Sequence, residues 1–230
     1  MAKWVHSSVE LVQPIDADAF IKKIEYACRT CYRSQDKITD GSAEKLIRNC
    51  IARGHESVLE HGNITMRIVC DRGVSHELVR HRLASYSQES TRYCNYTKDK
   101  FGNELQFIYP DWWYDIDFDS LSQFDYESKP ELFWWDELNE FCQYAEEIYQ
   151  RMIYDDATPD VARAVLPNCL KTELVMTMNI RELRHFIKLR ISKFAHPDIR
   201  RIAKLMLKLL CDLGFRIFFE DIIAEYEQDL

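Results

Sequence analysis

A dense cluster of cationic and hydroxyl side chains stands in the stretch "RHRLASYSQESTRY" at residues 80–93, which holds three arginines, one histidine and three serines. Ser90 and Arg92 lie on the same side if the chain is extended there. A guanidinium beside hydroxyls and backbone N–H groups binds phosphate well. The candidate ligands are a nucleic-acid backbone and a phosphorylated small molecule, and the alternative is plain solvation. The sequence has no Gly-rich loop, so it contains neither a P-loop nor a dinucleotide fingerprint.

The geometry of the first half of this cluster depends on whether it is helical. The spacing in "VSHELVRHRLAS" predicts a helix on which Glu77, Arg80 and His81 share one face. Consecutive helical residues are turned by about 100° from one another, so Arg80, His81 and Arg82 cannot all point to one ligand. These three residues are therefore either exposed to solvent at the end of the helix or in contact with ligands on two different surfaces.

Two later stretches add polar and cationic side chains: "ARAVLP" contributes Arg163, and "NIRELRHFIKLR" contributes Asn179, Arg181, Arg184, His185 and Arg190. On a helix, Asn179 and Arg190 nearly eclipse each other, whereas Arg181 and Arg190 lie on opposite faces. Arg184 and Lys188 are neighbours one turn apart, and surface solvation explains this pair. The apolar residues between these groups must be buried. We therefore expect Arg181, His185 and Arg190 to rim a cleft.

The stretch "GHESVLEHGN" at residues 54–63 carries His55, Ser57, Glu60 and His61. The two histidines are poorly spaced for a helical metal site, and the pattern is not the HExxH of zinc proteases. Two interpretations explain this stretch equally well. It is either a junction between a helix and a strand with polar capping residues, or a turn that binds a ligand.

The eight cysteines are scattered, and only "CRTC" at residues 28–31 has metal-ligand spacing. Because no second CxxC and no His-rich segment accompanies it, we expect no metal site. Buried, small apolar side chains near a helix end are the simpler interpretation.

Composition limits the class of protein. The 230 residues and 47% hydrophobic content predict one domain over residues 1–230 with a sizeable core. The net charge of -8 disfavours general binding to nucleic acid or to anionic membranes. No apolar run is long enough for a transmembrane helix, and "MAKWVHSSVELVQ" lacks the apolar stretch of a signal peptide. We therefore expect a cytoplasmic protein.

Hydrophobic periodicity indicates the elements that position these groups, and helices outnumber strands. The expected strands cover residues 63–73 and 104–110. The first expected helix starts at Asp16. Further helices are expected over residues 42–54, 74–85, 134–153, 159–167, 196–214 and 215–228. Residues 111–137 are acidic and aromatic without periodicity, which predicts an irregular excursion. The fold class is α+β, a mixed sheet with packed helices.

Taken together, these stretches resemble one known family. "RHRLASYSQESTRY" is similar to the signature of the flavin-dependent thymidylate synthases, "GHESVLEH" resembles their GHxSxxEH segment, and "ARAVLP…NIRELRHFIKLR" resembles their C-terminal nucleotide and flavin segment. The resemblance covers residues 54–190. It implies an α+β homotetramer with shared active sites, and a reductive methylation of dUMP to dTMP with FAD as cofactor and NADPH and methylenetetrahydrofolate as co-substrates.

The resemblance also implies the site residues. FAD contacts are implied for His55, Ser57, Glu60, Arg80, His81, Arg82, Gln88, Asn179, Arg181 and His185. Contacts to dUMP are implied for Glu77, Arg80, Gln88, Glu89, Ser90, Thr91, Arg92, Arg163 and Arg190. Arg190, Ser90 and Arg80 are implied in catalysis. Where the family often has a small hydroxyl residue near the first helix, this chain has Cys31.

The implied roles have a physical basis. Arg92 and Arg163 suit the nucleotide phosphate. Arg190 suits the uracil edge, where a fixed positive charge favours loss of the N3 proton. Ser90 suits orientation of the substrate, because the sequence shows no base beside it that would make it a nucleophile.

Three alternatives remain open: a nucleic-acid-binding module, an enzyme with a cysteine nucleophile, and a relative that binds nucleotide without catalysis. Net charge disfavours the first, and the lack of any cysteine in a matching signature disfavours the second. The complete arginine set disfavours the third.

Overall fold

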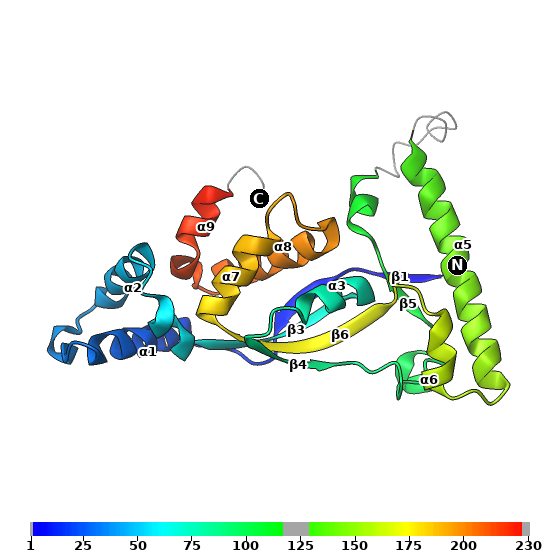
Figure 1. Cartoon of the computed structure of the whole chain (residues 1–230), viewed down its shortest axis with the longest axis horizontal. Coiled ribbons are helices and arrows are strands. Elements are labelled where there is room, and N and C mark those ends of the chain that lie inside the picture. Colours follow the sequence, from blue (N-terminus) through cyan, green and yellow to red (C-terminus); the bar gives the residue numbers. More distant parts are fainter. Residues whose placement is uncertain (1, 117–128, 227–230) are drawn as a thin grey trace. The chain divides into compact units, whose positions relative to one another are not determined.

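The structure, a computed structural model, describes residues 2–116 and 129–226 (Figure 1). Its described part contains helices and strands with helices in the majority, which confirms the α+β prediction. The chain divides into two compact units, each assembled from separate segments: unit 1 takes residues 1–8, 69–78 and 88–174, and unit 2 takes residues 9–68, 79–87 and 175–230. The single domain expected over residues 1–230 stays a prediction.

Unit 2 contains most of a four-stranded sheet in the order β2-β3-β6-β4. These strands are β2 (Ser8–Leu11), β3 (Asn63–Asp71), β4 (Ala84–Gln88) and β6 (Lys171–Asn179). Its helices are α1 (Ala17–Thr30), α2 (Ser42–Ala52), α7 (Ile180–Arg190), α8 (Pro197–Asp212) and α9 (Glu220–Glu225), with 3-10 helices at Gln35–Lys37, Glu56–His61 and Arg216–Phe218.

Strand β3 shows why the sheet forms. Ile64, Met66 and Ile68 alternate with more exposed residues and are 0% exposed themselves, as the sequence predicted. On β6, Met176 and Met178 are buried in the same alternating pattern. Each of these strands therefore presents one apolar face to the core of unit 2.

Side chains at the helix starts determine where the helices of unit 2 begin. The Ala19 backbone N–H donates to Asp16 Oδ1 at 3.1 Å, which makes Asp16 the N-cap of α1. The Glu182 N–H donates in the same way to Asn179 Oδ1 at 2.9 Å at the start of α7. The predicted stop of α2 is confirmed, because Gly54 follows the helix with a φ of 69° that suits glycine.

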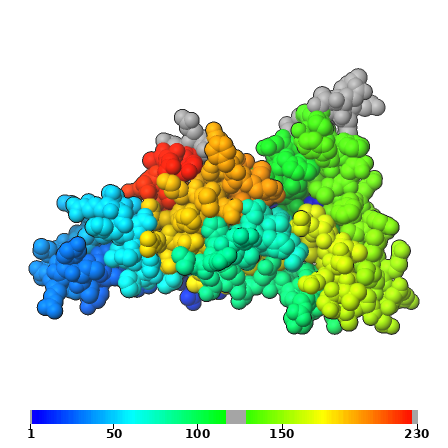
Figure 2. Space-filling model, viewed as in Figure 1, coloured from blue at the N-terminus to red at the C-terminus, as the bar shows by residue number. Residues whose placement is uncertain are grey.

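Close packing in unit 2 brings α7 beside other segments. α7 packs on α8 and on the 3-10 helix Glu56–His61, which in turn packs on α1. Gly62 permits this contact, because a Cβ on it would lie 2.6 Å from Phe20 Cζ. Its carbonyl accepts from the Ile180 N–H at 2.8 Å. Figure 2 shows the segment around α2 beside the segment around α9, where Arg48 and Glu220 form an ion pair at 2.8 Å.

The predicted helix over residues 74–85 is wrong in its second half. Helix α3 (Arg72–Leu78) ends before the arginine-rich stretch, and the chain turns and enters β4. The apolar face of the helix stops at Leu78, since Leu83 is 72% exposed and gives a longer helix nothing to bury. Pairing of β4 with β6 satisfies the backbone instead.

The stretch after β4 is a turn rather than extended chain. The Tyr93 and Cys94 N–H groups donate to Ser90 O at 3.1 and 2.9 Å. The Arg92 N–H donates to Ser90 Oγ at 3.3 Å. The chain is therefore not extended here, so the condition under which Ser90 and Arg92 would lie on one side of a strand is not met, although the turn still keeps them close together.

Unit 1 contains a parallel pair of short strands, β1 (Lys3–Val5) and β5 (Gln106–Ile108). Its helices are α3, α5 (Pro130–Tyr154) and α6 (Pro159–Ala162), with 3-10 helices at Asp99–Phe101, Asp111–Asp115 and Arg163–Val165. Phe107, Tyr149 and Leu170 lie at the centre of its core. Of the irregular excursion expected over residues 111–137, the described ends are helical, and residues 117–128 lie outside the described residues. No helix in the described part is long and apolar enough to cross a membrane.

Candidate active site

The predicted site residues divide between the two units in a simple way. All the residues implied for the flavin except Gln88 belong to unit 2. All the residues implied for the nucleotide except Arg80 and Arg190 belong to unit 1. Each unit is therefore described by its own chemistry.

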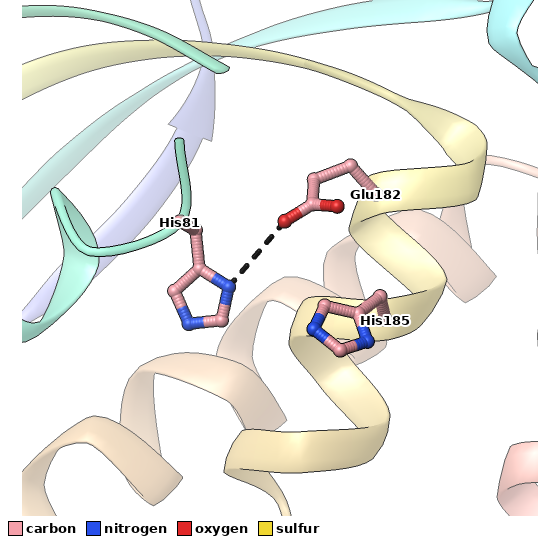
Figure 3. Close-up of side chains that lie close together, drawn as sticks. All are labelled: His81, Glu182 and His185. Atoms are coloured by element: carbon pink, nitrogen blue, oxygen red, sulfur yellow. Dashed lines mark ion pairs between the residues drawn. The ribbon is translucent and has the colours of Figure 1, made fainter. Parts of the chain in front are cut away.

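His81 is the centre of the polar groups in unit 2 (Figure 3). Its side chain is 5% exposed and packs edge-on against Phe186, with ring centroids 4.8 Å apart. Arg190 Nε donates to His81 Nε2 at 3.1 Å. On the other side of the ring, His81 Nδ1 lies 3.5 Å from Glu182 Oε1. The structure thus joins the "RHR" segment to α7 through one buried imidazole.

Burial and neighbouring charge decide the protonation of this imidazole. Burial, followed by the charges of Arg190 and His185, lowers the pKa of His81 to about 4. His81 is therefore neutral near pH 7. The Tyr86 hydroxyl donates to the His81 carbonyl at 2.9 Å, and burial followed by the charge of Glu182 raises the pKa of Tyr86 to about 12.

His81, Glu182 and His185 also bring possible metal-ligand atoms within 4.8 Å of one another. The bond from Arg190 argues against a metal ion there. A neutral imidazole that accepts a proton donor at Nε2 carries its own proton on Nδ1, which leaves no lone pair at Nδ1 for a metal. The expectation of no metal site stays a prediction.

The other polar residues of α7 differ in their surroundings. Arg181 is exposed and pairs with Glu60 at 2.6 Å, so two of the residues implied for the flavin contact each other. Arg184 is only 7% exposed, and its guanidinium binds Asp221 through two bonds of 2.8 Å. It also contacts Glu56 at 3.1 Å. Surface solvation is therefore the wrong explanation for Arg184, because the C-terminal segment covers it.

A hollow of about 590 Å³ lies beside α7 in unit 2, lined by His185, Lys188, Leu189, Arg190, Ser192, Phe194, Ala195 and Tyr226. Its lining mixes cationic with apolar side chains. The remaining residues implied for the flavin, His55, Ser57, Arg80 and Arg82, are exposed. A planar ring with an attached anionic group is the kind of ligand that such a surface binds.

Two exposed arginines of unit 1, Arg92 and Arg163, both act on the carboxylate of Asp160. The pKa of the Asp160 carboxyl is lowered, first by a hydrogen bond from Thr158 and also by the charges of Arg92 and Arg163. Both guanidinium groups therefore lie near the same carboxylate. A phosphate group could take the place of that carboxylate as their partner.

The turn and strand end beside these arginines are held by internal bonds. Gln88 Nε2 donates to Ser75 Oγ at 2.9 Å and to Thr172 Oγ1 at 3.2 Å. The Glu89 N–H donates to Glu173 O at 2.9 Å, and its carboxylate binds Lys171 at 3.0 Å. Thr91 is buried and Glu77 is half-buried on α3. In the described residues no base bonds to Ser90 Oγ, which fits an orienting role.

Glu182 and Tyr86 are the residues at this site that the sequence reasoning missed. The signal was present for Glu182, since Asn179 and Glu182 have the spacing of an N-cap and the third helical residue. Nothing in the sequence pattern indicated that β4 would place Tyr86 against the backbone of His81.

Comparisons with known proteins agree with this architecture. A family model described as thymidylate synthase complementing protein matches residues 12–213. The flavin-dependent thymidylate synthase of Geobacter sulfurreducens is 33% identical over 202 residues, covering 85% of this chain and 79% of the relative. That of Mycolicibacterium vanbaalenii is 35% identical over 224 residues, covering 88% and 80%. That of Pyrococcus furiosus is 32% identical over 197 residues, covering 85% and 74%.

Among solved structures, thymidylate synthase X from Helicobacter pylori with FAD and dUMP is similar at a TM-score of 0.69. The alignment covers 93% of this chain and 98% of that chain, with 22% sequence identity. At this identity the likeness shows the fold.

Proposed function

The chain belongs to the flavin-dependent thymidylate synthase family, and from this premise we propose that it converts dUMP to dTMP by reductive methylation. Methylenetetrahydrofolate supplies the carbon and leaves as tetrahydrofolate. NADPH supplies the reducing equivalents. When bound, FAD supplies the hydride chemistry that no side chain provides.

One observation carries the proposal at the level of the site. Arg190, from the end of α7, donates to His81 of the "RHR" segment, although 109 residues separate them in the sequence. These are two of the three stretches on which the family resemblance rests. Arg190 also lines the hollow of mixed polar and apolar lining beside α7, and its bond to His81 therefore supports a binding site in unit 2 to which both stretches contribute.

The residues of unit 2 fit a flavin cofactor. The exposed guanidinium groups of Arg80, Arg82 and Arg181 suit a pyrophosphate, because they are fixed charges with several donors. Ser57 and His55, also exposed, add hydrogen-bonding groups. Asn179 is engaged in capping α7, so its side-chain oxygen is already used and its amide N–H₂ is the group that suits a ligand.

The residues of unit 1 fit the nucleotide. Arg92 and Arg163 bind the phosphate of dUMP through charge-assisted bonds. Ser90 and Gln88 orient the nucleotide, and Glu77, Glu89 and Thr91 shape the surrounding surface. Arg190 stabilises negative charge that develops on the uracil ring, since a guanidinium is a positively charged group with several hydrogen-bond donors. Arg80 assists at the same ring.

A homotetramer with shared active sites is part of the proposal. Leu83, Tyr93 and Phe194 are 72%, 77% and 89% exposed; Leu83 and Tyr93 directly follow Arg82 and Arg92, and Phe194 lines the hollow beside α7. Large exposed apolar side chains beside a binding site favour coverage by another subunit. The cytoplasmic location expected from the sequence stays a prediction.

The test uses the intact purified protein. We expect it to bind FAD, to oxidise NADPH, and to form dTMP when the reduced protein receives dUMP and methylenetetrahydrofolate without oxygen. We expect Arg190→Ala to retain FAD and to lose dTMP formation. Protein that binds dUMP but forms no dTMP would favour the alternative, a nucleotide-binding protein without catalysis. Nucleic-acid affinity that falls steeply with salt would favour a nucleic-acid-binding protein.

A further inference from the structure

Glu182 has a position in unit 2 that the proposed reaction does not explain. It is 8% exposed, and its backbone N–H is used by Asn179. Among the described residues, no lysine or arginine lies within ion-pair distance of its carboxylate. A buried carboxylate without a cationic partner is costly unless a donor reaches it. His81 Nδ1 lies 3.5 Å from Glu182 Oε1 and can donate toward this carboxylate when it carries the ring proton (Figure 3).

We propose that Glu182 is a positioning residue that holds Arg190 in place through the imidazole of His81. This inference rests on the proposed function, in which Arg190 acts on the uracil ring. Its structural part concerns only three side chains of unit 2.

The direction of the two contacts that His81 makes, with Arg190 and with Glu182, follows from which atoms carry protons. A guanidinium has donors only, so the 3.1 Å contact requires an unprotonated Nε2 on His81. A neutral imidazole has a single proton, which must then be on Nδ1. That N–H faces Glu182 Oε1, and a carboxylate at this distance favours the proton on the nitrogen that faces it. Glu182 and Arg190 thus select the same tautomer from opposite sides of the ring.

The neutral state of His81 is necessary for this arrangement, because a second proton on Nε2 would remove the acceptor for Arg190. The charged and titratable groups that face His81 are Glu182, His185 and Arg190 from α7, while Tyr86 from β4 binds its carbonyl. Burial and the cation of Arg190 both oppose protonation. If the acceptor at Nδ1 is lost, a buried N–H has no partner, and the ring gains by turning away from Arg190.

Two substitutions of Glu182 distinguish the effect of its hydrogen-bond acceptor from the effect of its negative charge. Glu182→Gln keeps an oxygen that can accept from Nδ1 and removes the charge, whereas Glu182→Leu has similar size and no acceptor. The first readout is the ¹⁵N and proton NMR spectrum of histidine- and arginine-labelled protein with FAD and without substrate, with His81→Asn and Arg190→Lys used for assignment. Glu220→Gln, which removes an exposed ion pair with Arg48 in the same unit, is the matched control.

We expect wild-type protein, Glu182→Gln and Glu220→Gln to show a single His81 tautomer protonated at Nδ1 and a slowly exchanging Arg190 Nε–H. We expect Glu182→Leu to show mixed tautomers and fast exchange at Arg190. The second readout is turnover: kcat should fall roughly fivefold to tenfold in Glu182→Leu, as for one lost hydrogen bond, and should stay within about twofold in Glu182→Gln.

A wild-type tautomer in Glu182→Leu would overturn the proposal, and so would equal losses of kcat in the two variants with unchanged spectra. A double variant sharpens the result: in a His81→Asn background, Glu182→Leu should change kcat by less than about twofold, because no imidazole remains to be held. An additive loss there would assign Glu182 a purely structural role. If wild-type protein makes no dTMP, the proposed function fails, while the spectra still decide whether Glu182 holds Arg190.

Discussion

Acidification should destabilise this protein through His81, and the size of the effect follows from its burial. The pKa of His81 falls from an ordinary 6.5 to about 4 in the folded chain because burial, Arg190 and His185 all oppose the imidazolium. The unfolded state therefore binds a proton between these pH values while the folded state does not. A lowered folded pKa contributes stability that is fully present above about pH 6.5 and is lost as the pH falls toward about 4.

The linkage relation gives the magnitude. Between about pH 7.5 and about pH 5, His81 alone should lower the free energy of unfolding by about 2 kcal/mol, and the full loss below both pKa values is about 3 kcal/mol. For a chain of this size, 2 kcal/mol corresponds to a fall in Tm of about 4–8 °C. The side chain is almost fully buried, so solvent screening reduces these values little.

Urea unfolding at the two pH values measures the effect, with His81→Asn as the test and His61→Asn, at an exposed position, as the control. We expect the pH-dependent loss of stability to be smaller in His81→Asn by about 2 kcal/mol and unchanged in His61→Asn. Equal pH dependence in wild-type protein and His81→Asn would show that His81 titrates normally in the folded state. The reasoning about its buried, neutral imidazole would then be refuted.

Three further outcomes are expected. Arg184→Met should cost about 2–3 kcal/mol in urea unfolding because it removes a buried guanidinium and its charge-assisted hydrogen bonds to the partly exposed carboxylates of Asp221 and Glu56, whereas Arg48→Met, at an exposed pair, should cost less than about 1 kcal/mol; similar losses would contradict the role of the buried guanidinium. Arg163→Ala should raise the KM for dUMP by roughly tenfold or more without changing FAD content, and an unchanged KM would remove Arg163 from the phosphate site. Gly62→Ala should lower stability by about 1–3 kcal/mol because its Cβ would meet the Phe20 ring at 2.6 Å, and wild-type stability would show that the ring moves freely.

Local patterns were enough for several elements. Asp16 and the apolar residues behind it predicted α1, and the alternation of Ile64, Met66 and Ile68 predicted β3. These features depend on neighbours within a few residues, so the physics that forms them is present in the sequence itself. The family resemblance likewise depends on residue types and spacing, and the comparisons confirm it.

Local patterns failed where long-range contacts decide the backbone. "VSHELVRHRLAS" has helical spacing, yet Ala84–Gln88 becomes β4 because β6, far away in the sequence, offers backbone partners. Arg184 looked like a solvated cation, yet Asp221 and Phe218 from the C-terminal segment enclose it. In both cases the deciding partner lies outside any window that periodicity can examine.

The sequence by itself determined which chemical groups are available: the arginines, the histidines, and the spacing that identifies the family. Only the tertiary structure decided how they are used. It buried His81 between Glu182 and Arg190, which sets its proton on one nitrogen and its lone pair on the other. Charge states and hydrogen-bond directions depend on distance and burial, and these quantities exist only once distant segments have packed together.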